Sequence, residues 1–354
     1  MNAGPANVGR LHLSTVDPEH DHATATAAES LPGATVFHSA AWCRLLHDCY
    51  GFRTRLFVAE ADDGRVLAAV PVTELPCWPR GARGVSLPFA DFCPIVHGRA
   101  EARDFLHAAI ARHAFERAWR HWELRGDGAP EGASPSTLFH GHVLRLDHSD
   151  GDFPPAAVPS VRRAVRKAVN SRVSIEFSRD EAALRRFHEL YCRTRRRHGT
   201  PPAPWRFLAA VGRELITPGQ GFVALARRGG VDLAGAVFLR HGPRALYKYG
   251  ASDPDNHSFR PNHLLMARSV ARLVREGCVE LHLGRTSLGA EGLRRYKLSW
   301  GAVEHIISYT RLDPVGGRFL TAPDRTRTWP TRFFRRLPTP LLRAVGAILH
   351  PRLA

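Results

Sequence analysis

The chain alternates short apolar runs with polar turns, a pattern that predicts strands and helices in mixed order. In the first half, apolar runs at 55–60 and 65–72 flank a D-D-G turn at 62–64 and predict a β-hairpin. Ser39 can cap a helix over 40–49, because apolar side chains recur there at helical spacing. The other elements expected in this half are a strand at 84–96, a helix at 101–119 and strands at 121–125 and 140–146.

The second half shows a longer version of the same order and opens with a basic helix at 161–170. The expected elements that follow are a strand at 173–177, helices at 180–197 and 205–215, strands at 221–227, 231–241 and 244–251, a helix at 262–276, a strand at 279–283, a helix at 291–300 and a strand at 303–311. A strand that follows a crossover helix indicates parallel pairing within a mixed sheet. We therefore expect an α/β protein of the α+β mixed-sheet kind, with two domains of similar architecture.

Length and loop composition predict where the domains begin and end. The chain has 354 residues, which is long for one domain and sufficient for two hydrophobic cores. Residues 147–160 hold three Pro, three Asp and one Gly, which is typical of a linker. The expected parts are a loose N-terminal arm at 1–33 with room for one strand, a first domain at 34–150, a second domain at 160–312 and a basic C-terminal tail at 313–354.

The charge of the chain is strongly positive, with 50 Lys and Arg against 33 Asp and Glu, a formal net charge of +17. This surplus favours anionic partners such as phosphate-bearing substrates, RNA or an anionic membrane face, or it reflects a general preference for Arg over Lys. The stretch 160–200 alone carries twelve Arg and Lys against four Asp and Glu. That stretch is either a solvated helix face or a surface for tRNA or another polyanion, in which case affinity falls steeply with salt.

Several functional classes find no support in the sequence. The six cysteines form no C-x-x-C pair, and the twenty histidines include no H-E-x-x-H motif, so we expect no metal site. No G-x-S-x-G motif of a hydrolase is present. We see no signal peptide and no apolar stretch of about 18 residues, and we expect a cytoplasmic protein.

Six short segments together resemble a known family. They are Phe37–Trp42, Ser86–Asp91, Tyr249–Ser252, Arg260–Asn262, Leu283–Thr286 and Gly292–Gly301. In these segments the chain resembles the FemAB-like tandem-GNAT acyltransferases, including the FemAB-type proteins associated with exopolysaccharide and exosortase systems. The resemblance spans roughly residues 35–310, and it implies two tandem GNAT-like domains with the reaction site in the second.

The resemblance also implies an activity, the transfer of an acyl or aminoacyl group from an activated donor to an amine. The expected donor is an aminoacyl-tRNA, an acyl-CoA or an acyl carrier protein, and no cofactor is expected to stay bound. Cell-envelope, exopolysaccharide and amino-acid-conjugate synthesis are the expected settings. In the family, a lysine near the end of the second domain lies by the reacting carbonyl, which implies this role for Lys297. The family's tail returns to its first domain, which implies a discontinuous domain boundary here.

Lys297 is one of three lysines in the chain and the candidate catalytic residue. It is either a surface side chain whose amine reaches the solvent or a cation that stabilises the oxyanion of acyl transfer. Arg260 and Asn262 lie where a loop enters a helix, a place where ordinary GNAT enzymes hold a pyrophosphate on a glycine-rich turn. Here the turn has no glycine, and Pro261 removes one N–H donor. Arg260 can still hold a phosphate, whereas Asn262 contacts substrate or only caps the helix.

The remaining candidate binding residues are Arg285, Thr286, Asp91 and Tyr249. Arg285 and Thr286 follow a strand end, where a crevice often opens; the alternative is a salt bridge within the loop. Asp91 lies in an apolar stretch and needs a partner, so it orients the acceptor amine or pairs with an arginine. Strand alternation places Tyr249 on the same face as Tyr247, either towards a cleft or in the core.

The C-terminal segment 329–353 mixes large apolar side chains with arginines. It either lies on an anionic membrane surface, which would make the protein peripheral at the inner membrane face, or packs on its own protein. Two rival functions remain open: a non-catalytic basic module that binds RNA or an anionic lipid-linked glycan, and an N-acyl amino-acid synthase that uses acyl carrier protein. The oligomeric state does not follow from the sequence.

Overall fold

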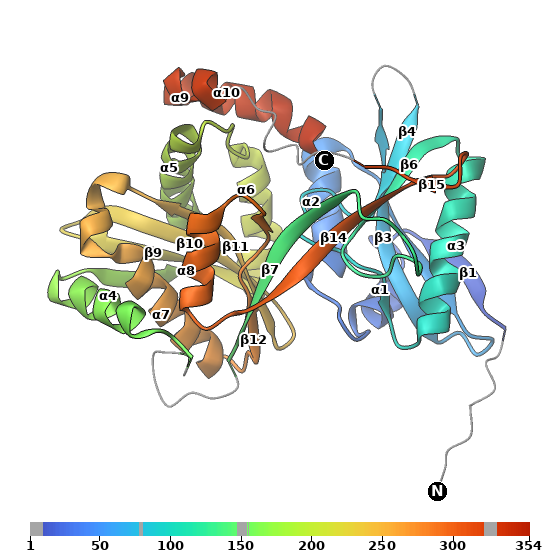
Figure 1. The fold of residues 1–354 in the computed structure, drawn as a ribbon, viewed down its shortest axis with the longest axis horizontal. Coiled ribbons are helices and arrows are strands. Elements are labelled where there is room, and N and C mark those ends of the chain that lie inside the picture. The colour runs from blue at the N-terminus through green and yellow to red at the C-terminus, as the bar shows by residue number, and fades with distance from the viewer. Residues whose placement is uncertain (1–9, 78–80, 147–153, 155, 322–330) are drawn as a thin grey trace, which may run out of the picture. The chain divides into compact units, whose positions relative to one another are not determined.

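The computed structural model describes residues 10–77, 81–146, 154, 156–321 and 331–354 (Figure 1). The chain divides into two compact units, and each is formed from two stretches of sequence. Unit 1 comprises Met1–Leu138 and Ile307–Pro323, and unit 2 comprises Phe139–Ile306 and Asp324–Ala354. The chain therefore crosses between the units three times, so the domain boundary is discontinuous.

Unit 1 is a twisted sheet covered by three helices. Its strands are β1 (His12–Val16), β2 (Thr54–Glu60), β3 (Val66–Pro76), β4 (Ala82–Val85), β5 (Val96–His97), β6 (Trp119–Arg125), the second half of β14 (Val303–Asp313) and β15 (Arg318–Phe319). The helices are α1 (His22–Glu29), α2 (Ala40–Tyr50) and α3 (Ala100–Glu116). The strand order β1-β2-β3-β4-β6-β14 contains one parallel pair, β4 with β6. Leu106 and Ile110 of α3 pack against Phe57, Val70 and Trp122 of the sheet in the core of unit 1.

Local signals in unit 1 account for most of its elements. The Ser39 hydroxyl accepts a hydrogen bond from the backbone N–H of Trp42 at 3.2 Å, so the predicted helix cap is present. β2 and β3 form the predicted hairpin. Two expectations for this half need correction. The expected strand at 84–96 ends at Val85, and the backbone beyond it is irregular, with a positive φ of 60° at Phe89.

The N-terminal arm is the second correction. Residues 1–33 were expected to be a loose arm with room for one strand, and β1 is such a strand, paired with β2. The helix α1, which buries Ala25 and Ala28, was not expected. Asp21 caps α1 by accepting a hydrogen bond from the backbone N–H of Thr24. The small side chains of α1 give a weak helical pattern, which explains why the sequence did not predict this helix.

Unit 2 is a mixed sheet with helices on both faces. Its strands are β7 (Thr137–Arg145), β8 (Ser174–Ser178), β9 (Gly221–Arg228), β10 (Val231–His241), β11 (Arg244–Ser252), β12 (Glu280–His282), β13 (Thr286–Ser287) and the first half of β14. The helices are α4 (Pro159–Asn170), α5 (Glu181–His198), α6 (Trp205–Val211), α7 (Pro261–Arg275), α8 (Glu291–Ser299), α9 (Thr331–Arg336) and α10 (Thr339–Leu349). The strand order is β7-β12-β11-β10-β9-β8, and β11 and β12 form its parallel pair.

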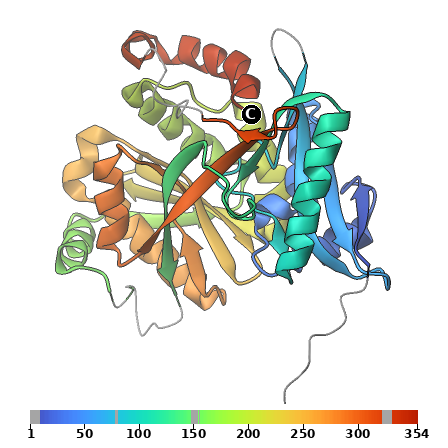
Figure 2. The same ribbon diagram turned by 45° about the vertical axis from the view of Figure 1, so that its right-hand side comes forward.

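The two faces of this sheet carry different helices. The ribbon shows α5, α6, α9 and α10 on one face and α4, α7 and α8 on the other (Figures 1 and 2). The core beneath α7 contains Leu265 and Val270 of that helix, Phe222 and Phe238 of the central strands, and Trp300. The predicted order of strands and helices is therefore found in unit 2, with a mixed sheet as expected.

Strand pairing explains why the domain boundaries differ from 34–150 and 160–312. Leu144 of β7 pairs with Leu281 of β12, so this expected closing strand of the first domain belongs mainly to unit 2. Thr310 of β14 pairs with Leu124 of β6, so the end of β14 belongs to unit 1. Most of the expected linker 147–160 lies outside the described residues.

The expected C-terminal tail, 313–354, is divided between the units. Its first part, to Pro323, belongs to unit 1, whereas α9 and α10 belong to unit 2. Phe334 and Leu342 are buried in unit 2, and the His350 ring lies 4.9 Å from the ring of Phe207 of α6. These apolar contacts place the end of the tail in unit 2. Among the described residues, no helix is long and apolar enough to cross a membrane.

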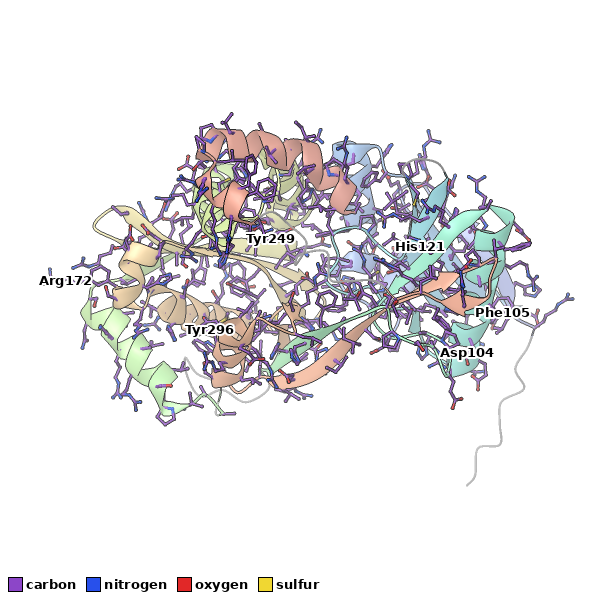
Figure 3. All side chains as sticks on the ribbon, turned by 45° about the horizontal axis from the view of Figure 1, so that its top comes forward. Asp104, Phe105, His121, Arg172, Tyr249 and Tyr296 are labelled. Carbon is purple, nitrogen blue, oxygen red and sulfur yellow. The ribbon has the colours of Figure 1, made fainter. Side chains whose placement is uncertain are left out.

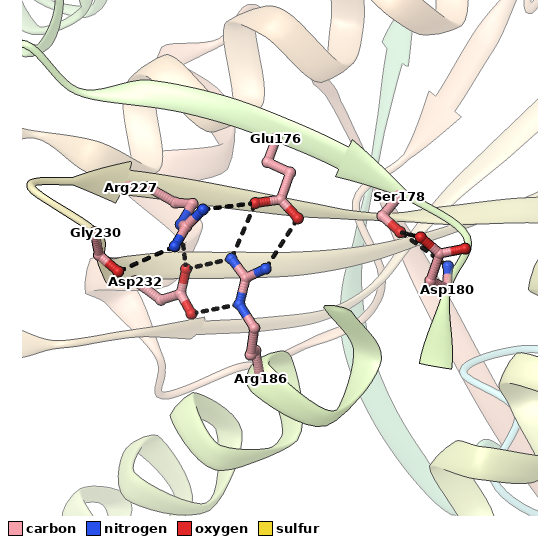
Figure 4. Close-up of polar contacts among 7 residues, drawn as sticks. All are labelled: Glu176, Ser178, Asp180, Arg186, Arg227, Gly230 and Asp232. Atoms are coloured by element: carbon pink, nitrogen blue, oxygen red, sulfur yellow. Dashed lines mark hydrogen bonds and ion pairs between the residues drawn. The ribbon is translucent and has the colours of Figure 1, made fainter. Parts of the chain in front are cut away.

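Part of the basic stretch 160–200 has a structural role (Figure 4). Arg186 of α5 donates hydrogen bonds to both Glu176 of β8 and Asp232 of β10 at 2.7–3.0 Å. Arg227 of β9 pairs with the same two carboxylates at 3.1 Å. Two arginines and two carboxylates therefore join α5 to three strands, and Arg186 is not available to an anionic ligand.

Candidate functional site

Lys297 lies on the face of α8 that points into unit 2, with only 3% of the residue exposed. Its ammonium donates hydrogen bonds to the carbonyl oxygen of Gly284 and to the Thr286 hydroxyl, both at 2.8 Å. A third contact joins the ammonium to the carbonyl oxygen of Arg285 at 3.4 Å. Lys297 is therefore a buried cation rather than a surface side chain that reaches the solvent.

The backbone around Lys297 lies where two parallel strands separate. β11 and β12 pair through Arg244–Leu246 and Glu280–His282, after which β12 ends. β11 continues to Ser252 alongside β10, while Thr286 of β13 pairs with His140 of β7 instead. The oxygen atoms that hold the lysine thus belong to the segment that turns away from β11. In open α/β sheets, ligands bind beyond the carboxyl ends of the strands, at the point where neighbouring strands diverge.

A carboxylate network lies next to Lys297. Glu304 of β14 accepts two hydrogen bonds from Arg294 of α8, at 2.7 and 2.8 Å. The same carboxylate lies 3.1 Å from Nε2 of His142 and 3.4 Å from Nδ1 of His140. The Arg294 hydrogen bonds lower the pKa of Glu304 to about 2, despite partial burial. Glu304 is therefore ionised at neutral pH and fixes the orientation of the His142 ring.

His142 is neutral at physiological pH. Burial and the Lys297 ammonium lower its pKa to about 4, against the opposite effect of Glu304. Its side chain is fully buried, and Nδ1 has no hydrogen-bond partner among the described residues. Within the described residues, no group of His, Cys, Asp and Glu could hold a metal ion. The cluster is therefore a fixed cation next to a neutral imidazole.

The Arg-Pro-Asn corner forms a second, separate feature. Arg260 caps α7 with a positive φ of 59°, a conformation that costs most residues about 1–2 kcal/mol. Together with Arg163 and Lys167 of α4 it lines a cavity of about 420 Å³, which His263 and Ser299 also line. Burial, with Arg260 nearby, lowers the pKa of His263 to about 4, so the cations of this cavity are the two arginines and the lysine.

One helix connects these two features. The Tyr296 hydroxyl of α8 donates a hydrogen bond to the carbonyl oxygen of Asn262 at 3.3 Å, and Ser299 of α8 lines the arginine cavity. Lys297 lies between them on α8 but faces the other way and does not line that cavity. Asn262 is not the helix cap, because α7 already begins at Pro261. α8 therefore bridges the buried cation and the basic cavity.

The remaining predicted residues lie in three places. Thr286 is buried and contacts Lys297 directly, whereas Arg285 extends its guanidinium over the ring of Phe139 at 4.5 Å. Tyr249 contacts Tyr191 of α5 at a ring distance of 5.8 Å. Asp91 belongs to unit 1, where its carbonyl oxygen accepts a hydrogen bond from the Tyr309 hydroxyl.

The prediction that Tyr247 and Tyr249 lie on the same face of the strand is wrong, because β11 is irregular. Val237 pairs with Tyr249, but the next residue, Phe238, pairs with Tyr247, so Lys248 is inserted as a bulge. Tyr247 packs on Phe238 in the core under α7, and burial raises its pKa to about 12. Tyr249 instead faces α5, whereas Tyr296 lies against α7 (Figure 3).

Sequence reasoning missed His142, Glu304 and Arg294. They come from β7, β14 and α8, and 162 residues separate His142 from Glu304. The one available signal was the H-G-H sequence at 140–142, because strand alternation places two histidines on the same face. Their carboxylate partner could not be predicted without the pairing of distant segments.

Comparison with known proteins identifies the class of the second unit. Residues 158–298 match the family model of the acetyltransferase (GNAT) domain, so unit 2 contains a GNAT acyltransferase domain. The fold of the whole chain is similar to that of FemX, with 14% identity, a TM-score of 0.67, and coverage of 84% of this chain and 96% of FemX. A tandem GNAT protein from the clavulanic acid biosynthesis pathway is also similar, with 15% identity, a TM-score of 0.52, and coverage of 89% of this chain and 100% of that one.

A third similar structure is L-PGS from Bacillus licheniformis, with 11% identity, a TM-score of 0.53 and coverage of 93% of this chain and 95% of that one. None of the curated proteins compared with the chain matches it. The chain thus contains a GNAT acetyltransferase domain at residues 158–298, and its fold is that of proteins with two GNAT-like domains. The predicted fold and the resemblance to the FemAB-like tandem-GNAT acyltransferases are confirmed at the level of the fold.

Proposed function

We propose that unit 2 transfers an acyl or aminoacyl group from an activated donor to an amine, with Lys297 stabilising the oxyanion. The observation that carries this proposal is the burial of the Lys297 ammonium at the point where β11 and β12 separate. A buried cation persists only where hydrogen bonds hold it, and it acts more strongly on a developing charge than a solvated cation does.

The chemistry requires charge stabilisation at one atom. The acceptor amine attacks the donor carbonyl, a carbon–nitrogen bond forms, and the carbonyl oxygen becomes an oxyanion. Collapse of this intermediate expels the donor's leaving group, and the amine releases one proton. The 3.4 Å contact between the Lys297 ammonium and the carbonyl oxygen of Arg285 is weak, so a substrate oxygen can replace it at little cost. We assign no general base, since a substrate group can accept the proton.

The basic cavity at the Arg-Pro-Asn corner supports an anionic donor. Arg163, Lys167 and Arg260 contribute three positive charges, and guanidinium groups bind phosphate in a bidentate manner. Aminoacyl-tRNA, acyl-CoA and acyl carrier protein all carry a phosphate ester in the part that bears the acyl group. The proposal therefore places that phosphate in this cavity, with the acyl end directed along α8. Binding both substrates in one site lowers the entropic barrier to their reaction.

A donor panel tests the proposal. The purified full chain is incubated with aminoacyl-tRNAs, acyl-CoAs and acyl carrier proteins in the presence of mixed amine acceptors, and mass spectrometry follows donor and product. We expect one donor class to be consumed and an amide to form. An Arg260→Gln variant should raise the KM for that donor about tenfold with a smaller change in kcat, because a phosphate contact binds ground state and transition state alike.

The control variant is Arg295→Met, which removes an exposed arginine from α8 outside the cavity and should leave the KM unchanged. Consumption of no donor in the panel would count against catalysis and in favour of a non-catalytic basic module. An equal effect of the two variants would contradict a specific phosphate contact at Arg260.

A further inference from the structure

The C-terminal helices carry large apolar side chains on their exposed face. Phe333 of α9 is 59% exposed, and Leu341 and Ile348 of α10 are 56% and 63% exposed. We call the exposed face of α9 and α10 the tail surface. It lies on the same side of unit 2 as α5 and α6, at the outer edge of that layer (Figure 1).

α10 carries more apolar side chains than packing on its own protein requires. Its inner face buries Leu342, and Gly346 lies so close to the Pro202 carbonyl that an added Cβ would overlap it. Leu341, Ala344 and Ile348 recur at three and four residues on another side of the helix, and all three are exposed. A helix that only covers a core has a polar outer face, whereas α10 is apolar on both.

The charge of the tail surface has one sign. Residues 331–354 contain five arginines and no aspartate or glutamate. Arg335 of α9 also lines a cavity of about 430 Å³ together with Arg193, Arg196 and Arg197 of α5. None of these four arginines makes an ion pair with a residue of the described chain. Two aspartates, Asp253 and Asp255, also line the cavity, which leaves a net surplus of two positive charges.

We propose that the tail surface docks on a bilayer that contains anionic phospholipids. Apolar side chains beside arginines, in a helix too short to span, are typical of a helix that lies in the membrane interface. Leu341 and Ile348 would enter the boundary between the lipid headgroups and the acyl chains, and the arginine cavity would hold lipid phosphate groups. RNA would use the arginines but would leave Leu341 and Ile348 exposed to water, so the observations favour the bilayer. The inference does not depend on the proposed function.

Vesicle flotation tests this inference on the full chain. Vesicles of phosphatidylcholine alone are compared with vesicles that also contain phosphatidylglycerol, at low and high salt. We expect binding to the anionic vesicles only, with affinity that falls as salt increases, since each arginine near an anionic surface contributes through a screened attraction. The Leu341→Glu/Ile348→Glu double variant should bind at least about tenfold more weakly, because both side chains lose their apolar contact.

The matched control is Val231→Glu/Val315→Glu, which adds the same two charges at apolar residues that are 56% and 72% exposed elsewhere. This control should bind anionic vesicles nearly as wild type does. An Arg196→Gln/Arg335→Gln variant should lose about tenfold in affinity for anionic vesicles. Thermal unfolding confirms that each variant is folded.

Three results would overturn the proposal. One is equal binding of wild type and the Leu341/Ile348 variant to anionic vesicles, and another is the absence of binding by wild type. The third is binding of a structured RNA by wild type with no vesicle binding, which would assign the arginines to a nucleic acid instead.

Discussion

Glu123 of β6 is the buried carboxylate whose removal should have the largest effect on unit 1. It is 1% exposed and accepts hydrogen bonds from Arg125 Nε at 2.8 Å and from Arg311 Nε at 2.6 Å. Arg311 lies on β14, so this carboxylate joins the returning strand to β6. Glu123→Gln keeps the volume but leaves two guanidinium groups without their counter-charge. Breaking a buried pair costs about 3–5 kcal/mol, and we expect unit 1 to lose that much stability.

Hydrogen exchange with mass spectrometry, combined with urea unfolding, measures the stability of each unit separately. We expect faster exchange in β6 and the end of β14 of the variant, with unit 2 unchanged, because no described residue of unit 2 shares this network. Asp63→Asn removes an exposed carboxylate that pairs with Arg65 and should leave the unfolding midpoint unchanged. If the free energy of unfolding of unit 1 falls by less than about 1 kcal/mol, Glu123 is not a buried charge that the arginines stabilise.

The pH dependence of this effect has a defined sign. Burial alone would raise the pKa of Glu123, but Arg125 and Arg311 outweigh it and hold the pKa well below its usual value of 4.5. A carboxylate with a lowered folded-state pKa stabilises the fold fully above its unfolded-state pKa and loses this contribution as pH falls towards the folded-state value. The difference between wild type and Glu123→Gln should therefore be constant from pH 7 to about 5 and should shrink in stronger acid.

Three further predictions concern other parts of the chain. Glu304→Gln should lower the pKa of His142 below about 4, since the Glu304 carboxylate raises it. NMR titration of the His142 ring measures this pKa, and an unchanged or higher value would contradict an interaction between the two side chains. Gly84→Ala should destabilise unit 1 by about 1–3 kcal/mol, because its Cβ would overlap the Trp119 ring; Gly98→Ala, which has open space, is the control in urea unfolding. Donor affinity should fall as salt increases, and less steeply for Arg260→Gln, in a fluorescence binding assay.

Local patterns predicted the elements that depend on neighbours in sequence. The Ser39 cap, the β2–β3 hairpin and the order of helices and strands in unit 2 were predicted because each follows from spacing, capping or turn residues. Apolar small residues such as Ala25 and Ala28 bury a helix without a strong pattern, so α1 was missed. The pairing of β7 with β12 in unit 2 and of the end of β14 with β6 in unit 1 joins segments far apart in the sequence. Local patterns do not encode such pairing.

The candidate site shows the same limit. Lys297 and Thr286 were predicted, and the structure brings them together at 2.8 Å. The bulge at Lys248 separated the two tyrosines, because one inserted residue reverses the alternation of a strand. His142 and Glu304 were not predicted, because their contact exists only once β7 and β14 have folded next to each other.

Single-turnover transfer by Lys297→Met, with the donor that the panel identifies, separates a catalytic ammonium from a structural one. If the buried ammonium stabilises the oxyanion, the transfer rate should fall by about 10²–10³ while donor affinity stays within about threefold of wild type. Arg295→Met, on the exposed face of the same helix, should transfer at the wild-type rate. A folded Lys297→Met variant that transfers as fast as Arg295→Met would contradict the account.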